Sequence, residues 1–308
     1  MRVVVTGGAG FIGSHVADAF LEQGNEVLVV DDFSSGSREN LPEEAEVAEL
    51  DIADAARLET AFSEFNPDFV CHLAAQVSVT VSVADPARDF ASNVQGTFNV
   101  VRSATDHGAR VAFASTGGAL YGEGAPLPTP ETYVPQPLSP YGASKQAAEA
   151  YVATFQRLTG IAHAVLRLGN VYGPRQDPHG EAGVVAIFSE RLLTGAPPVV
   201  YGHGTPTRDY VHARDIVRAF TTLAETEVAG TFNLGWGREI TVLQVLAGLQ
   251  RAAGTTVEPQ LESLRPGELT RSAIDSSSAQ AAFGWRPEVG LEDGLAETLD
   301  WFAAKIAA

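Results

Sequence analysis

The glycine-rich run TGGAGFIG at positions 6–13 constrains the fold of this chain more than any other segment. It lies between a short β-branched run and a helical pattern, which indicates the turn of a strand–turn–helix unit. Gly7 would permit the tight turn, Gly10 would let the backbone approach a pyrophosphate, and Gly13 would let the helix pack closely on the strand. The run therefore predicts a dinucleotide site made by Gly7, Gly10, Phe11, Ile12 and Gly13.

Two carboxylates follow at the end of the second expected strand. Asp31, next to Asp32, stands 18 positions after Gly13 (31 minus 13), about where a carboxylate meets the ribose hydroxyls of adenosine. The same negative charge would repel a 2′-phosphate. The sequence therefore favours NAD over NADP as the cofactor, with Asp31 and Asp32 in its site.

The first half of the chain alternates short β-branched runs with longer helical patterns, which is typical of stacked βαβ units. The expected strands are Arg2–Thr6, Glu26–Val30, Phe69–His72, Arg110–Ala114 and Ala162–Leu168. The expected helices are Phe11–Gln23, Ala53–Phe65, Pro86–His107 and Tyr141–Thr159, with a last one near Leu291–Ile306. This order predicts an α/β fold with a doubly wound, parallel, Rossmann-like sheet and a ligand at the carboxyl ends of its strands.

The regular alternation ends after Leu168, where glycines and prolines become frequent. Loops of this kind usually form binding surfaces on a rigid scaffold. We therefore expect residues 1–168 to form the NAD-binding domain and residues 169–308 to form mainly a smaller C-terminal substrate-binding lobe. Some segments of the second half should return to the first domain.

Composition argues against several classes of partner. The formal net charge of −18 disfavours a nucleic-acid partner, because phosphate backbones require a basic surface. No apolar run approaches the roughly 20 residues of a membrane span, and the N-terminus lacks a signal-peptide pattern, so no membrane partner is expected. The seven histidines are scattered and predict no metal site. The lone Cys71 suits a reducing cytoplasm.

A tyrosine and a lysine stand four residues apart at the start of one expected helix. Tyr141 and Lys145 would share a helical face, and the lysine ammonium would favour the tyrosine phenolate, whose ordinary pKa is about 10. Lys145 is one of only two lysines in the chain. Ser115 and Thr116 follow the expected strand Arg110–Ala114, where a doubly wound sheet presents its ligand. These four residues are the candidate catalytic group.

Together the glycine pattern, the YxxxK spacing and the hydroxyl-rich turn resemble the extended short-chain dehydrogenase/reductase family. Further segments resemble its UDP-glucose 4-epimerase branch, in the family's order along nearly the whole chain: His72–Gln76, Asn93–Thr97, Leu166–Pro174, Arg208–His212 and Arg265–Glu268. The resemblance implies that Tyr141 is the acid/base and that Lys145 orients the nicotinamide ribose. It also implies that a serine or threonine hydroxyl positions the sugar oxygen.

One position departs from the pattern of that family. Many members have a hydroxyl residue four positions before the tyrosine that here is Tyr121, and this chain has Gly117 there. We therefore assign the catalytic hydroxyl to Thr116, with Ser115 as the second candidate.

The resemblance also implies contacts for the two ligands. Those expected at the cofactor are Asp51 and Ile52 at adenine, Leu73, Ala74 and Ala75 beside the pyrophosphate, and Asn93 in the pocket. At a UDP-sugar, the resemblance implies a substrate contact for Asn170, and it implies that Arg208 and Arg265 bind the diphosphate. The others expected there are Glu268 on the uridine ribose, and Ser272, Thr116 and Tyr141 around the sugar. Arginine forks suit phosphate oxygens, although a surface ion pair is the usual role of an isolated arginine.

The expected activity is an NAD-dependent isomerase: a 4-epimerase that interconverts UDP-glucose and UDP-galactose, and also the N-acetylated pair, through a 4-keto sugar. Epimerisation of UDP-glucuronate or of a UDP-pentose is the rival within the class. A non-catalytic NAD-sensing protein is the rival from another class. The resemblance further implies a homodimer, paired through the helices at Pro86–His107 and Tyr141–Thr159.

Overall fold

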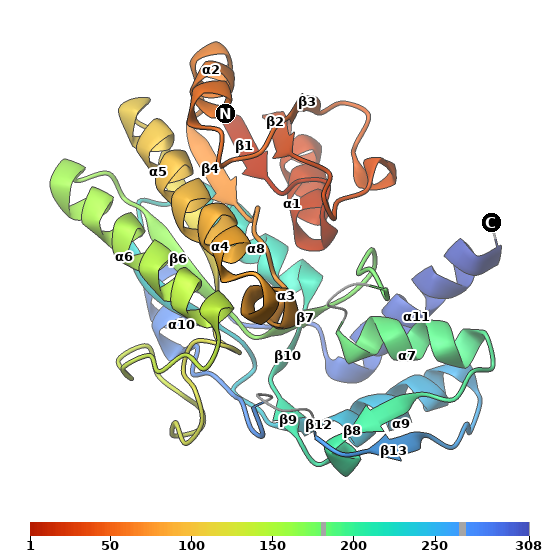
Figure 1. Cartoon of the computed structure of the whole chain (residues 1–308). Coiled ribbons are helices and arrows are strands. Elements are labelled where there is room, and N and C mark those ends of the chain that lie inside the picture. Colours follow the sequence, from red (N-terminus) through yellow and green to blue (C-terminus); the bar gives the residue numbers. More distant parts are fainter. Residues whose placement is uncertain (180–182, 265–268, 308) are drawn as a thin grey trace.

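A seven-stranded parallel sheet forms the centre of the molecule, which a computed structural model describes over residues 1–179, 183–264 and 269–307 (Figure 1). The strand order is β11-β6-β5-β4-β1-β2-β3, and every neighbouring pair is parallel. The strands are β1 (Arg2–Thr6), β2 (Glu26–Asp31), β3 (Glu46–Glu49), β4 (Phe69–His72), β5 (Arg110–Thr116), β6 (Ala164–Leu168) and β11 (Gly230–Leu234). The predicted doubly wound sheet is confirmed.

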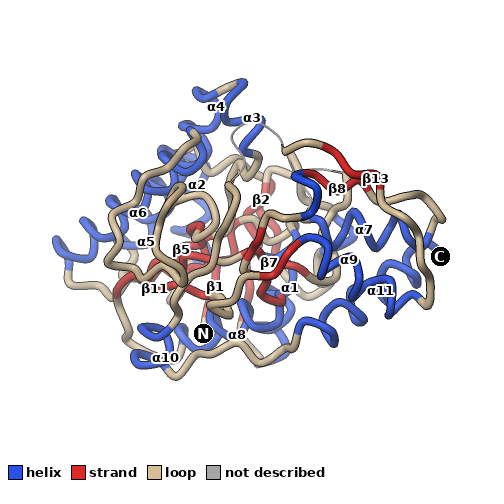
Figure 2. The backbone as a smooth tube through the Cα atoms, turned by 90° about the horizontal axis from the view of Figure 1, so that it is seen from below, coloured by secondary structure: helices blue, strands red, loops and turns tan. Residues whose placement is uncertain are grey.

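Helices cover both faces of this sheet, and Figure 2 shows the strands enclosed between them. One face packs on α1 (Phe11–Glu22), α8 (Ala213–Ala224) and α10 (Ser277–Phe283). The other packs on α2 (Ala55–Phe65), α5 (Gly96–Asp106) and α6 (Pro140–Thr159). The strand Val3–Val5 is fully buried, with Val3 and Val5 in one core and Val4 in the other. Burial on both faces explains why this strand is apolar at all three positions.

The expected helix Pro86–His107 is present with an interruption. It consists of α4 (Pro86–Phe90), a π-helical turn η2 (Ala91–Gln95) and α5, and it is preceded by the short α3 (Val79–Ala84). A π-helical turn widens the helix by one residue and is frequent at functional sites. The expected helix Tyr141–Thr159 begins one residue earlier, because Pro140 occupies its first position and Ser139 caps it.

Two strands of the large sheet were not predicted from sequence. β3 is a mostly exposed edge strand of sequence EVAE, so it has no apolar pattern. β11 lies in the loop-rich second half of the chain and pairs with β6. Together with α8 and α10, β11 returns to the large sheet. The division into residues 1–168 and 169–308 stays a prediction.

A second group of helices packs around a separate core, at the lower right of Figure 1. It consists of α7 (Val184–Leu193), α9 (Val242–Ala253) and α11 (Leu291–Ala307). Three two-stranded sheets accompany it: β7 (Asn170–Tyr172) with β10 (Tyr210–His212), β8 (Val199–Tyr201) with β13 (Gln260–Glu262), and β9 (Thr207–Arg208) with β12 (Ile240–Thr241). Two 3₁₀ turns, η1 (Arg38–Asn40) and η3 (Gly202–Gly204), lie in loops.

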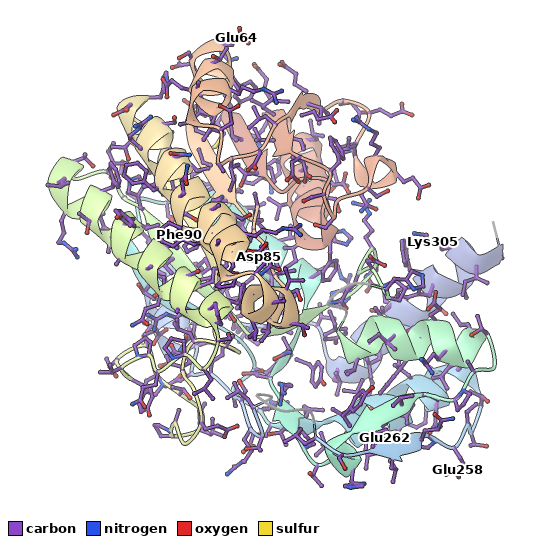
Figure 3. All side chains as sticks on the ribbon, in the orientation of Figure 1. Glu64, Asp85, Phe90, Glu258, Glu262 and Lys305 are labelled. Carbon is purple, nitrogen blue, oxygen red and sulfur yellow. The ribbon has the colours of Figure 1, made fainter. Side chains whose placement is uncertain are left out.

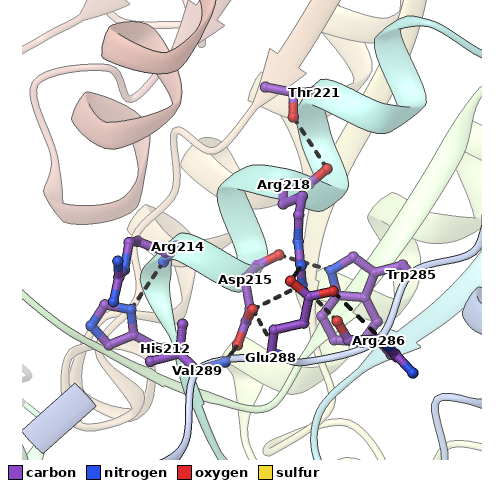
Figure 4. A network of polar contacts seen from close by, with 9 residues as sticks. All are labelled: His212, Arg214, Asp215, Arg218, Thr221, Trp285, Arg286, Glu288 and Val289. Atoms are coloured by element: carbon purple, nitrogen blue, oxygen red, sulfur yellow. Dashed lines mark hydrogen bonds and ion pairs between the residues drawn. The ribbon is translucent and has the colours of Figure 1, made fainter. Parts of the chain in front are cut away.

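A buried carboxylate joins α8 to the loop that leads into α11 (Figure 4). Asp215 accepts hydrogen bonds from the backbone N–H groups of Glu288 at 3.0 Å and Val289 at 3.1 Å. The indole N–H of Trp285 donates to the backbone carbonyl of Asp215 at 2.8 Å. Arg218 completes the cluster with an ion pair to Asp215 at 2.9 Å. These contacts fix the orientation from which α11 starts.

The described part of the chain offers no membrane span, since none of its helices combines the necessary length and apolar character. Within the same residues, no group of three or more His, Cys, Asp or Glu side chains is arranged to hold a metal ion. Acidic side chains are spread over the periphery, with Glu64, Asp85, Glu258 and Glu262 at separate places in Figure 3. Lys305 lies near the outer end of α11 in the same view.

Candidate active site

A cavity of about 1340 Å³ opens at the carboxyl ends of the central strands. Its wall includes most residues that the sequence assigned to a cofactor: Gly7, Gly10, Phe11, Ile12, Gly13, Asp31, Asp32, Asp51, Ile52, Leu73, Ala74, Ala75, Tyr141 and Lys145. Side chains of α7 and α11 line it as well, among them Glu190, Trp301 and Phe302. The cavity therefore lies where an open α/β sheet is expected to bind its ligand.

The glycine loop leaves no room for side chains at two of its three key positions. Gly7 has φ +71°, and a Cβ there would come within 2.7 Å of the backbone nitrogen of Ala74. A Cβ on Gly13 would overlap the carbonyl of Gly7. Gly10 differs, because a Cβ there would meet only the Gly7 carbonyl, at 3.2 Å. The bare backbone at the start of α1 forms a cradle into which a diphosphate fits.

Asp31 is directed to the same loop from the end of β2. Its Oδ2 accepts a hydrogen bond from the N–H of Ala9 at 2.9 Å, and its Oδ1 accepts one from the N–H of Phe33 at 2.9 Å. Burial raises the pKa of Asp31, although the two backbone hydrogen bonds oppose this shift. A carboxylate in this position can accept hydrogen bonds from ribose hydroxyls, as the sequence predicted.

The surroundings of Asp31 contain a cation that is already engaged. Arg38 forms an ion pair with Glu49 and lies over the ring of Phe33, 4.1 Å from its centroid. Asp32 is exposed and accepts hydrogen bonds from the backbone and hydroxyl of Ser34. The acidic pair and the occupied arginine together disfavour a 2′-phosphate, which supports NAD rather than NADP.

The remaining residues of the cofactor set are less uniform. Ile52 is buried, whereas Asp51 is exposed and accepts a hydrogen bond from the N–H of Ala53 at 2.8 Å. Asn93 lies behind the wall: its side chain donates to the Gln76 carbonyl at 2.8 Å and accepts from the Gln76 N–H at 3.0 Å. Gln76 itself lines the cavity. Asn93 therefore shapes the pocket through Gln76.

Lys145 is buried under the start of α6, and Tyr141 lies one turn before it on the cavity wall. The ammonium of Lys145 donates to the carbonyl of Ala114 at 3.0 Å and lies 4.8 Å from the centroid of the Phe113 ring. Burial lowers the pKa of Lys145 to about 8, against the opposing effects of the Asp89 and Glu149 carboxylates. Tyr141 and Lys145 therefore line the same cavity from successive turns of α6, and a lysine cation near a tyrosine favours its phenolate.

The two candidate hydroxyls have different partners. Ser115 lines the cavity, but its hydroxyl donates to the buried carboxylate of Glu149 at 2.5 Å. The hydroxyl oxygen of Thr116 accepts from the N–H of Ala119 at 3.1 Å, so its proton can be donated elsewhere. A Cβ built on Gly118 would lie 4.0 Å from the Thr116 hydroxyl and 3.4 Å from the side-chain oxygen of Asn170. Thr116 and Asn170 therefore both lie close to Gly118. The proton that Thr116 can still donate favours it as the hydroxyl that meets a sugar, because the Ser115 hydroxyl already donates to Glu149.

The residues expected at the nucleotide sugar are less fully assembled than the cofactor set. Arg265 and Glu268 lie outside the described residues. Among the described ones, Tyr141 is part of the large cavity's wall, whereas Thr116, Asn170, Arg208 and Ser272 are not. Arg208 donates to the carbonyl of Thr207 at 2.9 Å, and Ser272 is buried.

A second hollow, of about 460 Å³, is lined by Gly202, His203, Thr205, Pro206, Ser263, Leu264, Thr270 and Arg271.

Several functional residues were missed in the sequence. Arg175, Trp301 and Lys305 line the cavity although nothing in their local pattern indicated it. Gln76 also lines the cavity and was named only as the last residue of the segment His72–Gln76. For Lys305 one signal existed, because it is the second of only two lysines and both line the same cavity.

Comparison with known proteins agrees with this geometry. Residues 3–235 match the model of the NAD dependent epimerase/dehydratase family. The chain is 42% identical to the UDP-glucose 4-epimerase of Mycolicibacterium smegmatis, with 99% of each chain covered. It superposes on the UDP-glucose 4-epimerase of Thermotoga maritima, solved with UDP-glucose, with a TM-score of 0.96 at 45% identity over 99% of this chain and 100% of that one.

A third match is the Thermus thermophilus UDP-glucose 4-epimerase in complex with NAD, with a TM-score of 0.92 at 45% identity over 98% of this chain and 99% of that one. The family match covers well over half of the chain, and these relatives span its whole length. The chain therefore belongs to the NAD dependent epimerase/dehydratase family.

Proposed function

We propose that this protein is an NAD-dependent 4-epimerase that interconverts UDP-glucose and UDP-galactose. The observation that supports this most directly is the position of Tyr141 and Lys145 at the start of α6, on the wall of the cavity that also contains the glycine loop and Asp31. Family relatives of the same full length are named for this activity.

The residues of the chain can perform the proton transfer that the reaction needs. Tyr141 takes the proton of the sugar 4-hydroxyl and later returns one to the 4-keto oxygen, with Lys145 favouring its phenolate. Thr116 donates a hydrogen bond to the same sugar oxygen, and Asn170, like Thr116, lies close to Gly118. NAD, held by the glycine loop and Asp31, supplies a reversible hydride acceptor.

Epimerisation requires the sugar to present both of its faces while the nucleotide remains bound. Arginines that bind the diphosphate provide this anchor, because guanidinium groups form bidentate hydrogen bonds with phosphate oxygens. We assign this role to Arg208 and Arg265. Ser272 and Glu268 are assigned to the sugar and the uridine ribose.

The sister reaction, 4,6-dehydration of the sugar, is disfavoured by the turn after Thr116. Members of the family that dehydrate place two acidic residues directly after the catalytic threonine, and this chain has Gly117 and Gly118. A Cβ on Gly117 would lie 2.8 Å from the Cδ1 atom of Ile274 and 3.2 Å from the Leu168 carbonyl. An acidic side chain at position 117 would therefore have to displace the Ile274 side chain.

Product identification by NMR tests this function. The enzyme is incubated separately with UDP-glucose, UDP-N-acetylglucosamine, UDP-glucuronate and UDP-xylose, and we expect UDP-galactose from the first. Turnover of UDP-glucuronate or UDP-xylose alone would assign the activity to those sugars. Tight NAD binding without turnover of any of the four would indicate an NAD-sensing protein.

We also propose that the protein is a homodimer that pairs through α4, α5 and α6. Apolar side chains are exposed along this surface: Phe90 at 56%, Tyr151 at 42% and Leu158 at 76%, with Phe90 beside these helices in Figure 3. Ala143 and Ala150 are exposed on α6, so they permit a close helix approach, whereas Ala148 packs in the protein's own core. Light scattering at micromolar concentration should give twice the mass of the 32.4 kDa chain, and a monomer would refute the pairing.

The expected compartment is the cytoplasm. Cys71 is the chain's single cysteine and is buried, which suits a reducing environment.

A further inference from the structure

Asp89 lies at the centre of a buried cluster of hydrogen bonds behind the cavity wall. Its side chain is fully buried in α4. Oδ1 accepts from the side-chain amides of Gln76 at 2.8 Å and Asn93 at 2.9 Å, and Oδ2 accepts from the hydroxyl of Ser144 at 2.5 Å. All three donors are neutral, so they satisfy the oxygens of the carboxylate without neutralising its charge.

This cluster joins three separate parts of the site. Gln76 belongs to the loop after β4 that lines the cavity. Asn93 belongs to the π-helical turn between α4 and α5, and its side chain also forms two hydrogen bonds with the Gln76 backbone. Ser144 belongs to α6, directly before Lys145 and three residues after Tyr141. One carboxylate therefore links the cofactor loop to the helix of the proposed acid/base.

Three titratable side chains, each on a different element, influence Lys145 or are influenced by it. His72 of β4 is uncharged near neutral pH, because burial and, secondarily, Lys145 lower its pKa to about 3. Glu149 of α6 is engaged by Arg167, which donates to both of its oxygens. Asp89 of α4 is the stronger of the two carboxylate influences that oppose the effect of burial on the pKa of Lys145.

We propose that Asp89 is a positioning residue for the reaction: its carboxylate fixes the start of α6 against the Gln76 loop and supplies the negative charge that faces the Lys145 ammonium. The inference rests on the proposed function in one respect, namely that Tyr141 and Lys145 act on the sugar and its cofactor. Without that charge, the ammonium of Lys145 loses a stabilising partner, and its pKa falls.

Two variants separate the charge of Asp89 from its hydrogen bonds. In Asp89→Asn the retained oxygen still accepts from Gln76 and Asn93, and the new amide can donate to a rotated Ser144 hydroxyl. That variant removes the charge and keeps the three contacts. The matched control, Ser144→Ala, removes one contact and keeps the charge.

The small number of lysines allows a direct readout in the intact enzyme. Isotope-labelled lysine gives two side-chain NMR signals, from Lys145 and Lys305, and Lys305→Arg assigns them. In the unmodified protein we expect Lys145 to titrate with a pKa of about 8. In Asp89→Asn this pKa should fall by about one unit or more, whereas Ser144→Ala should leave it unmoved. The pH–rate profile of epimerisation should shift to lower pH in Asp89→Asn alone.

The outcomes distinguish this inference from the proposed function. Unchanged Lys145 titration in a folded Asp89→Asn variant would overturn the role of Asp89, even if the enzyme remains an epimerase. If Asp89→Asn does not fold, titration of Lys145 in the unmodified enzyme still tests the inference. A Lys145 pKa well below 7 would contradict it, because it would show that no carboxylate supports the ammonium. Failure of the proposed function has another signature: the Lys145 titration shifts as expected in Asp89→Asn, but the unmodified enzyme epimerises none of the four UDP-sugars.

Discussion

Replacing Arg167 by methionine should destabilise the protein strongly, because it leaves a buried carboxylate without its cation. The side chains of Arg167 and Glu149 are each 9% exposed, and their closest contact is 2.6 Å. Burial lowers the pKa of Arg167, but the hydrogen bonds and charge of Glu149 outweigh it and raise the pKa above its ordinary value. The pair is therefore charged, with the charge of Glu149 balanced mainly by Arg167.

The expected loss follows from the desolvation of an unpaired charge. Breaking one side of a buried ion pair costs about 3–5 kcal/mol. Arg167 also donates to the hydroxyl of Tyr121 at 2.9 Å, so a second buried group loses a donor in the variant. We expect Arg167→Met to lose about 3–5 kcal/mol of unfolding free energy, and the double variant with Glu149→Leu to recover most of it.

Urea unfolding at a fixed NAD concentration measures these changes, since bound cofactor stabilises the native state by mass action. The matched control is Arg251→Met, which breaks an ion pair with Glu292 whose side chains are 61% and 64% exposed. That change should cost about 1 kcal/mol or less. A loss below about 1 kcal/mol for Arg167→Met, or no recovery in the double variant, would refute the reasoning.

Four further predictions concern the site. Asp31→Asn should relax the discrimination against NADP, and equal or tighter NADP binding by the unmodified protein would contradict the role of Asp31. Tyr141→Phe should lower turnover about 10²–10⁴-fold with cofactor binding largely intact; a rate within a few-fold of normal would place the chemistry elsewhere. Thr116→Ala should lower kcat more than Ser115→Ala, and the reverse order would exchange their roles. Ser272→Tyr should remove activity on UDP-N-acetylglucosamine while UDP-glucose is still accepted, as kcat/KM for both substrates will show.

The parts of the fold that the sequence predicts are those with a strong local pattern. The strand Arg2–Thr6 is mainly apolar because it is buried on both faces of the sheet. The loop that follows it is rich in glycine because the turn leaves no room for side chains at Gly7 and Gly13. β3 lacks such a pattern because its residues are mostly exposed. The π-helical turn at Ala91–Gln95 adds one residue to a helical turn, and no spacing of apolar residues reveals it.

The candidate site divides in the same way. Residues next to the ends of strands, such as Asp31, are placed by topology and could be predicted. Residues that reach the cavity from α11, such as Trp301, depend on how the second group of helices packs on the first. Asp89 was missed because its importance arises from contacts with Gln76 and Ser144, which lie 13 and 55 residues away in the chain.

In the proposed reaction, hydride leaves C4 of the sugar and returns to the same carbon without exchange with solvent. UDP-glucose deuterated at C4, incubated with the enzyme in ordinary water, tests this claim by NMR of the product. We expect the product to be UDP-galactose that retains its deuterium at C4. Loss of the label to solvent, or the absence of UDP-galactose, would contradict it.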